Sequence, residues 1–422
     1  MRVLLISANT ETMNMPALPL GPASVAAAAE SAGHDVLLLD LMFQPDAQSA
    51  AADAVRDFRP QAIGVSVRNI DDQVMANPHF LLPPARDIVA ACRGVSNAPI
   101  ILGGAGYSIF PERALRYLGA DMGIQGEGEA VFPALLERIG GGADVSGLAG
   151  IHLPGRPAQD GRFTRDLDDL PLPEPRLWIP SGAGRGDLWV PVQSRRGCPL
   201  DCTFCSTSLI EGRSVRRRSP ARVVRWLAAL NDAGCRNFNF VDNTFNLPPS
   251  YAKELCSRII EAGLQITFWA IIYPKWVDAE LAQLMSRAGC RQVSLGFESG
   301  SDRMLRSLNK RFSRQEVQAA SKLFQEAGIA RWGFLLLGAP GETRDSVEES
   351  LAFADSLKLE ALNVTAGIRI YPHTPLARTA LAEGVTERDA DLLSPCFYLA
   401  AGLRDWLPER VAAYKASRPW VN

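Results

Sequence analysis

Three closely spaced cysteines, Cys198, Cys202 and Cys205, are the residues of this chain best suited to chemistry. An odd number of neighbouring thiolates fits neither a disulfide framework nor a closed four-ligand zinc site. Three thiolates on one loop can ligate three irons of a 4Fe–4S cube and leave the fourth iron open to another ligand. The spacing therefore predicts an iron–sulfur cluster with a free coordination position.

The other cysteines are scattered and are expected to be buried side chains rather than ligands, with Cys396 the least clear of them. The N-terminus shows no signal-peptide pattern and no apolar run is long enough to span a bilayer, so we expect a cytosolic protein with reduced thiols. A net charge of −2 gives no electrostatic case for nucleic acid or an anionic membrane. A basic run at Arg213 and 216–218 is expected to be a solvated loop.

The elements that position the cysteines fall into two modules. Residues 1–140 alternate short apolar strands with helical stretches, a rhythm that predicts a doubly wound parallel sheet. The expected strands are 3–7, 36–40, 62–67, 99–103 and 122–125, and the expected helices are 23–32, 47–57, 84–92 and 112–118. Ligands of such sheets bind at the carboxyl ends of the strands.

Glycines gather at those strand ends. Gly103, Gly104 and Gly106 follow the fourth strand, and Gly126 and Glu127 follow the fifth. Glycine lets a backbone approach a bulky ligand, although tight turns entering helices explain such loops equally well. Arg68 and Asn69 follow the third strand, where a polar surface turn is the alternative.

Residues 141–184 are rich in Gly, Pro and Asp and are expected to form a linker with a short hairpin at most. Six further strand–helix units then predict a partial (βα)6 barrel over 185–385, and residues 386–422 form a short C-terminal tail. The expected strands are 189–193, 238–241, 266–272, 292–298, 332–337 and 363–370, and the expected helices are 221–233, 250–262, 279–288, 314–327, 345–357 and 376–382.

Polar residues and glycines mark the carboxyl ends of the barrel strands. They are Asp242, Glu298, Ser299, the run Gly338-Ala-Pro-Gly341-Glu-Thr, and Tyr371 with His373. Each has a bland alternative, such as Thr343 capping a helix or Asp242 closing a turn. Together with the cysteine motif, these segments resemble, in order and spacing, the cobalamin-binding radical S-adenosylmethionine (SAM) enzymes.

The resemblance implies roles for the residues quoted. Cys198, Cys202 and Cys205 would ligate the cluster, Asp242, Glu298 and Ser299 would contact SAM, and the backbone from Gly338 to Gly341 would line its adenine. Gly103, Gly104, Gly106, Gly126 and Glu127 would enclose the nucleotide tail of cobalamin, while Arg68 and Asn69 would pass beneath the corrin. Tyr371 and His373 would face substrate, as could Trp269, Tyr273 and Arg369.

Two departures from the family pattern stand out. The loop after the first strand, residues 8–14, lacks the Asp-x-His-x-x-Gly motif whose histidine ligates cobalt, so cobalamin would bind without a histidine ligand. His373 stands where the family usually has glycine.

The function implied first is methylation of an unactivated carbon of a small molecule, with one SAM supplying the methyl group and a second supplying the 5′-deoxyadenosyl radical. A rearrangement, cyclisation or ring contraction without methyl transfer is the enzymatic alternative, and a corrinoid or iron–sulfur sensor is the non-enzymatic one. A methylthiotransferase acting on RNA would need further cluster cysteines and a basic C-terminal module. A flavodoxin or ferredoxin is the expected electron donor, and neither nucleic acid nor a membrane is an expected partner.

Overall fold

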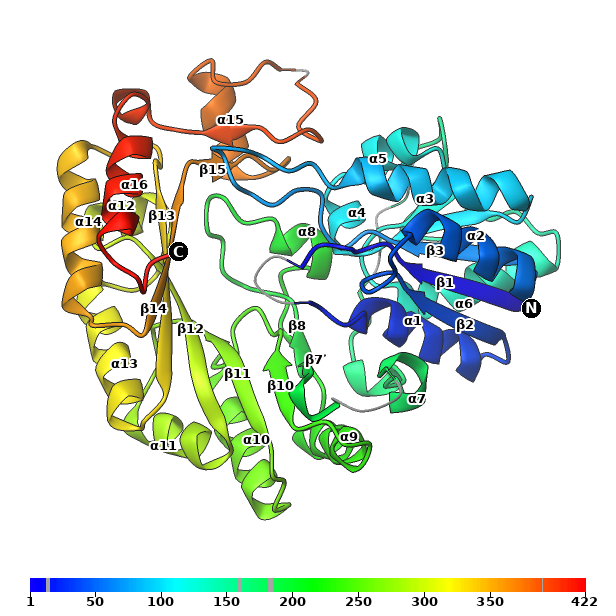
Figure 1. Ribbon diagram of the computed structural model, residues 1–422, viewed down its shortest axis with the longest axis horizontal. Coiled ribbons are helices and arrows are strands. Elements are labelled where there is room, and N and C mark those ends of the chain that lie inside the picture. The colour runs from blue at the N-terminus through cyan, green and yellow to red at the C-terminus, as the bar shows by residue number, and fades with distance from the viewer. Residues whose placement is uncertain (13–15, 158, 160, 162, 181–184, 389) are drawn as a thin grey trace.

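The computed structural model describes residues 1–12, 16–157, 159, 161, 163–180, 185–388 and 390–422. Part of the loop quoted after the first strand (13–14) and part of the expected linker (181–184) lie outside the described residues. Two α/β units stand side by side, with the N-terminal unit on the right and the larger one on the left of Figure 1. This arrangement confirms the predicted fold class.

The first unit is a six-stranded sheet with the order β2-β1-β3-β4-β5-β6. Its strands are β1 Arg2–Ser7, β2 Asp35–Asp40, β3 Ala62–Ser66, β4 Ile100–Gly103, β5 Met122–Ile124 and β6 Ile151–His152. The first five are parallel, as predicted, and β6 pairs antiparallel with β5. Because β6 comes from the expected linker, that segment is partly built into the first sheet.

Helices cover both faces of this sheet (Figure 1). They are α1 Leu20–Ser31, α2 Ala47–Phe58, α3 Leu82–Val95, α4 Ala105–Ile109, α5 Pro111–Leu118, α6 Gly128–Gly140 and α7 Pro175–Trp178. Helix α2 begins where the side chain of Asp46 accepts from two backbone amides of its first turn. Two short 3₁₀ turns, Leu167–Asp169 and Arg185–Asp187, lead from the first unit to the second.

The second unit is a curved sheet of six parallel strands with the order β14-β13-β12-β11-β10-β7. The strands are β7 Trp189–Val192, β10 Asn237–Phe240, β11 Thr267–Ile272, β12 Cys290–Glu298, β13 Ala330–Leu337 and β14 Ala361–Ala366. The helices are α9 Pro220–Asp232, α10 Pro249–Glu261, α11 Ala279–Arg287, α12 Asp302–Ser307, α13 Arg314–Glu326, α14 Arg344–Ser356 and α15 Pro375–Ala382. Strands β7 and β14 are the two edges, so the sheet is the predicted partial barrel.

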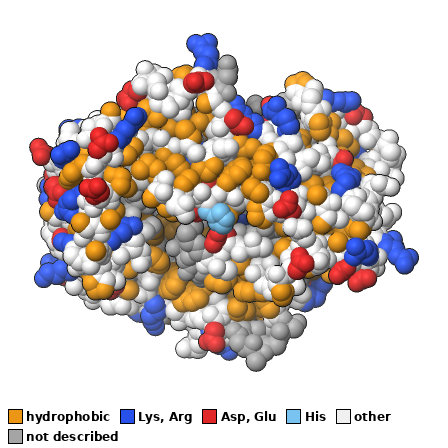
Figure 2. All heavy atoms as spheres, turned by 45° about the horizontal axis from the view of Figure 1, so that its top comes forward, with side chains coloured by type: hydrophobic (Ala, Val, Ile, Leu, Met, Phe, Trp, Pro, Cys, Tyr) orange, Lys and Arg blue, Asp and Glu red, His pale blue; other side chains and the backbone are white. Residues whose placement is uncertain are grey.

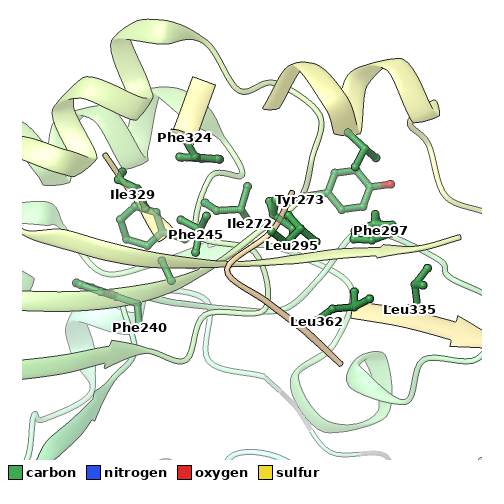
Figure 3. Packing of buried hydrophobic residues seen from close by; sticks show 14 of the residues in the cluster. Phe240, Phe245, Ile272, Tyr273, Leu295, Phe297, Phe324, Ile329, Leu335 and Leu362 are labelled. Atoms are coloured by element: carbon green, nitrogen blue, oxygen red, sulfur yellow. The ribbon is translucent and has the colours of Figure 1, made fainter. Parts of the chain in front are cut away.

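The core of the barrel lies between the strands and their outer helices. Every second residue of β13 is buried there, which is the pattern expected of a strand with one covered face. Figure 3 shows Phe240, Ile272, Leu295, Phe297 and Phe324 converging in this layer. Thr343 caps α14 through a capping box, so the helix-start interpretation of that residue is correct.

The C-terminal tail is more ordered than a short tail suggests. It contains β16 Phe397–Tyr398, which pairs antiparallel with β15 Ile368–Arg369, a 3₁₀ turn Ala401–Leu403 and helix α16 Leu407–Ala416. Its last residues return to the edge strand β14, where the amide of Asn422 donates to the carbonyl of Leu362 at 2.8 Å. The tail therefore belongs to the barrel unit.

Candidate cluster and cofactor site

The three cysteines lie on one excursion between β8 Arg195–Arg196 and β9 Arg216–Arg217, two short antiparallel strands with the helix α8 Thr207–Glu211 between them. We call residues 195–217 the cysteine hairpin. Cys198 is buried, and Cys202 and Cys205 are half-buried. Burial raises the pKa of the thiols of Cys198 and Cys202 in the absence of a metal.

The segment after α12 holds the cysteine hairpin from the barrel side. The amide of Thr203 donates to the carbonyl of Leu308 at 3.2 Å. The side-chain amide of Asn309 donates to the carbonyl of Asp201 at 3.0 Å, and Arg311 pairs with the carboxylate of Asp201 at 2.6 Å. Residues 308–311 thus fix the loop that carries the central cysteine.

The donor set and its surroundings fit a 4Fe–4S cluster. Within the described residues, no three His, Cys, Asp or Glu side chains converge on a single metal ion. A cube does not require that, because each of its irons takes its own thiolate. Two buried cations lie near the cysteines, Lys310 beside Cys202 and Arg195 beside Cys198, and Nη1 of Arg195 has no hydrogen-bond partner in the described structure. An anionic cluster would give that nitrogen a counter-charge.

A small cavity beside Cys202 and Cys205 is also lined by Arg213 and His373. His373 is exposed and has a φ of +61°, a left-handed conformation that glycine adopts without cost. The chain thus keeps, at His373, the left-handed backbone conformation that explains why the family usually has glycine at this position. The structure brings His373 to the cysteine loop, and the expectation that it faces substrate stays a prediction.

A larger cavity lies between the two units. Gly103, Gly104, Gly126 and Glu127 line it from the first unit, and the barrel side contributes Gln193, Arg196, Ile210 and Glu211. It holds about 850 Å³ of space that no atom fills and is partly open to solvent. The predicted glycine loops therefore do meet at one cavity, and the cysteine hairpin forms its opposite wall.

The glycines of this cavity differ in what they do. A Cβ on Gly103 would meet no atom within 4 Å, so that position borders free space. At Gly104, with a φ of +100°, a Cβ would lie 2.5 Å from the carbonyl oxygen of Val67, so the close approach of two strand ends requires glycine. Gly106, the other glycine of this loop, does not line the cavity; it lies against the carbonyls after β3, where a Cβ would be 3.0 Å from the oxygen of Arg68.

Arg68 and Asn69 line a separate small cavity together with the loop after β1. That loop contributes Ala8, Asn9, Thr10 and Glu11, and the side-chain nitrogen of Asn9 is buried without a partner in the described structure. The two strand-end loops thus face each other at the edge of the first sheet, where ligands of doubly wound sheets bind.

The basic run is only partly solvated, which corrects half of the expectation from sequence. Arg213 and Arg217 are exposed, as expected, whereas Arg216 and Arg218 are buried. Arg216 pairs with Glu127 at 2.5 Å, and Arg196 pairs with Glu129 at 2.5 Å, so these two arginines join the cysteine hairpin to the first unit. Glu127 therefore lines the cavity with its carboxylate already paired to an arginine of the cysteine hairpin.

Asp242 is placed differently from the prediction that it contacts SAM. Its side chain is buried at the end of β10. Oδ1 accepts from the amides of Ser194 and Arg195 at 2.8 and 3.1 Å, and Oδ2 accepts from the hydroxyl of Ser194 at 2.6 Å. Both oxygens are thus used to hold the start of the cysteine hairpin. Burial raises the pKa of Asp242 to about 6, against the opposing effect of Arg195.

The residues at the end of β12 divide into two roles. Glu298 keeps 15% of its side chain exposed and pairs with Lys310 at 3.0 Å. Ser299 is buried, and its hydroxyl lies 2.9 Å from that of Ser350, so it bonds within the protein rather than facing a ligand. Of this pair, only Glu298 remains a candidate for cofactor contact.

The turn from Gly338 to Gly341 is bonded within the protein. The amides of Gly338 and Ala339 donate to Oε2 of Glu342, and the carbonyl of Gly338 accepts from Ala400 at 3.0 Å. The carbonyls of Pro340 and Gly341 accept from Ser307 and Arg303, respectively. Both the amide and the carbonyl of Gly338 therefore already have partners within the protein. This pairing does not support the expectation that the backbone at Gly338 binds adenine.

Tyr371 stands where the two units and the cysteine loop meet. Its ring packs against Phe110 of the first unit, with ring centres 6.3 Å apart, and the next two residues, Pro372 and His373, line the small cavity beside Cys205. Burial raises the pKa of its hydroxyl, so Tyr371 is a neutral phenol at the junction. Arg369 is buried in an ion pair, and Tyr273 is buried in the barrel core with its hydroxyl accepting from the amide of Arg311, so neither side chain is exposed where the sequence suggested a substrate contact.

Sequence reasoning did not assign two groups that the structure places at the site. Lys310 lies in the segment after Glu298 and returns to the cysteine loop, and Arg196 and Glu211 complete the cavity between the units. Arg196 and Glu211 are charged residues that flank the cysteine motif in the sequence, which was the available signal for them, whereas Lys310 lies far from that motif along the chain and no such signal marked it.

Comparison with known families agrees with this geometry. The model of the radical SAM superfamily matches residues 192–354, and that of the B12 binding domain matches residues 6–136. The matched ranges correspond to the two units of the fold and include the cysteine hairpin and the glycine loops. The chain belongs to the cobalamin-binding radical SAM enzymes. Its predicted cofactors, a 4Fe–4S cluster, SAM and cobalamin, are confirmed as those of the family.

Relatives cover most of this radical SAM enzyme. An uncharacterised methyltransferase of Pyrococcus horikoshii is 28% identical over 91% of this chain and 84% of its own length. Tryptophan 2-C-methyltransferase of Streptomyces laurentii is 23% identical over 89% of this chain and 74% of its own length. The solved structure of the methyltransferase TsrM from Kitasatospora setae is 22% identical, covers 98% of this chain and 88% of its own, and superposes with a TM-score of 0.85, which shows a shared fold.

The surface of the enzyme carries charge of both signs. On the face shown in Figure 2, hydrophobic side chains run across the middle, and Lys, Arg, Asp and Glu are intermixed toward the rim. Among the described helices, none has the length and apolar character needed to cross a membrane.

Proposed function

We propose that this enzyme methylates an unactivated carbon of a small-molecule substrate, using one SAM for the methyl group and a second for the radical. The observation that carries the proposal is the shared wall: the hairpin that holds the three cysteines also lines the cavity closed by the glycine loops. A corrin above those loops would therefore lie next to SAM at the cluster. The relatives named as methyltransferases support the same reading.

The bound groups supply the radical and the methyl group, and the protein supplies positions. Cys198, Cys202 and Cys205 would ligate the cluster. Glu298, the partly exposed carboxylate beside the cysteine loop, would meet the amino group of SAM. Tyr371 would face the substrate as a neutral phenol at the domain junction, where it can donate a hydrogen bond without carrying charge.

The first unit would hold cobalamin without a histidine ligand. Gly103 and Gly126 border the cavity that would take the nucleotide tail, and Arg68 with Asn69 would lie beneath the corrin. The proposal includes a low-potential electron donor such as a flavodoxin or ferredoxin, because the cluster must be reduced before SAM is cleaved. It also places the enzyme in the cytosol.

The test is anaerobic reconstitution with iron, sulfide and cobalamin, followed by dithionite and SAM. We expect 5′-deoxyadenosine from radical formation and S-adenosylhomocysteine from methyl transfer to cobalamin, both of which can form before the substrate is known. Deoxyadenosine without S-adenosylhomocysteine would instead indicate a rearrangement or cyclisation. If neither product forms, an enzymatic function is overturned and the sensor function remains.

A further inference from the structure

Lys310 is a buried lysine whose side chain reaches the cysteine loop. Its Nζ lies 3.0 Å from Oε1 of Glu298 and 5.3 Å from the ring centre of Phe204, the residue directly before Cys205. Only 7% of its side chain is exposed. A buried cation is costly unless negative charge compensates it, and one carboxylate is the compensation visible at this position.

The ammonium group also lies near the sulfur of Cys202. Burial on its own would lower the pKa of Lys310, but the neighbouring carboxylate of Glu298 raises it above its ordinary value, so the side chain is charged. The lysine is therefore a fixed positive charge beside the loop whose cysteines would ligate iron.

The backbone keeps this charge in place relative to the loop. The amide of Lys310 donates to the carbonyl of Leu305 at 2.8 Å, which ties the residue to α12. Directly before it in the chain, the carbonyl of Leu308 accepts from the amide of Thr203, and the side chain of Asn309 donates to the carbonyl of Asp201. The position of the Lys310 charge is therefore fixed relative to the cysteine loop.

We propose that Lys310 sets the reduction potential of the cluster, with Glu298 opposing it. Reduction adds one electron, delivered by the external donor, and makes the cluster more negative. A nearby cation stabilises that reduced form and raises the potential, whereas a nearby carboxylate lowers it. The inference rests on the cluster of the proposed function but not on methyl transfer. Lys310 is accordingly a residue that acts through the cluster rather than on the substrate.

The experiment is a redox titration of the reconstituted protein, read from the electron paramagnetic resonance signal of the reduced cluster without SAM or cobalamin. Lys310→Met should shift the midpoint potential to more negative values, and Lys310→Arg, which keeps the charge, should stay near the wild-type value. Glu298→Gln should shift the potential in the positive direction. Lys275→Met is the matched control, because Lys275 bonds the same segment at the carbonyl of Arg311 and contacts none of the cysteines in the described structure.

Shifts of the midpoint potential in opposite directions for the two variants distinguish an electrostatic effect from a general loosening of the cysteine loop. If Lys310→Met and Glu298→Gln shift the potential in the same direction, or if neither shifts it, the inference is overturned. Iron and sulfide content is measured for each variant, and if Lys310→Met holds no cluster the positive shift of Glu298→Gln decides alone. A wild-type protein that assembles no cluster would overturn the proposed function as well, whereas an intact cluster that fails to methylate leaves this inference standing.

Discussion

Asp71 and Arg369 form a buried ion pair across the junction of the two units, with Oδ2 of Asp71 2.6 Å from Nε of Arg369. Their side chains are 0% and 2% exposed, respectively. The remaining nitrogens of Arg369 donate to the backbone carbonyls of Ile370, Leu392, Leu393 and Cys396. One guanidinium thus ties the loop after β3 to the barrel and to the C-terminal segment.

Replacing Asp71 with Asn leaves that guanidinium without a counter-charge. Because an unpaired buried charge is expensive, we expect the free energy of unfolding to fall by about 3–5 kcal/mol. Urea unfolding checks the change. The exposed pair of Arg314 and Glu349, at 2.9 Å, is the control, and Glu349→Gln should cost less than about 1 kcal/mol. Equal losses in the two variants would contradict the role given to Asp71.

The cavity between the units can be filled without disturbing the fold. A Cβ at Gly103 meets no atom within 4 Å, so Gly103→Leu should place its side chain in the cavity. We expect cobalamin affinity to fall at least about tenfold, or about 1.4 kcal/mol, with an unchanged melting temperature. Gly94→Leu, at another position with free space but outside the cavity, should bind as the wild type does. Equal binding by both variants, measured by absorbance titration, would place cobalamin elsewhere.

The cluster should depend on three cysteines and on none of the other five. Cys198→Ala, Cys202→Ala and Cys205→Ala should each lose most of the iron, the acid-labile sulfide and the visible absorbance after reconstitution. Cys396→Ser is the matched control, since Cys396 is also half-buried but lies on the β15–β16 side. A control variant that lost its cluster would show that the ligand set is wider than the motif.

Asp242 should make stability depend on pH. Burial raises its pKa to about 6 from an ordinary value of 3.8, so between these values the folded protein holds a proton that the unfolded chain releases. Its contribution is therefore full below about pH 4 and falls by roughly 3 kcal/mol as the pH rises through 6. Asp242→Asn should flatten this slope, as measured by urea unfolding at several pH values with metal-free protein. Parallel slopes in the two proteins would show that Asp242 is ionised throughout.

The sequence predicted the parts of the site that are local. The cluster motif could be found because its three cysteines, Cys198, Cys202 and Cys205, lie on one loop. The glycine loops could be found because the apolar pattern of each strand shows where the strand ends. It could not show which polar groups are already paired. Asp242 has the same type and position as a ligand-binding carboxylate, yet Ser194 and Arg195 occupy it. The partner of Arg369 is 298 residues away, and no local pattern encodes such a pairing.

The cysteine hairpin would take part in both proposed sites, since Arg196 and Glu211 line the large cavity from the same loop that carries Cys198. Binding free energies are reciprocal. Whatever affinity cobalamin gains from a hairpin shaped by the cluster, the cluster gains in equal measure from bound cobalamin. Loading of one cofactor therefore reports on the other, and a preparation lacking cobalamin is expected to misstate how firmly this enzyme holds its iron.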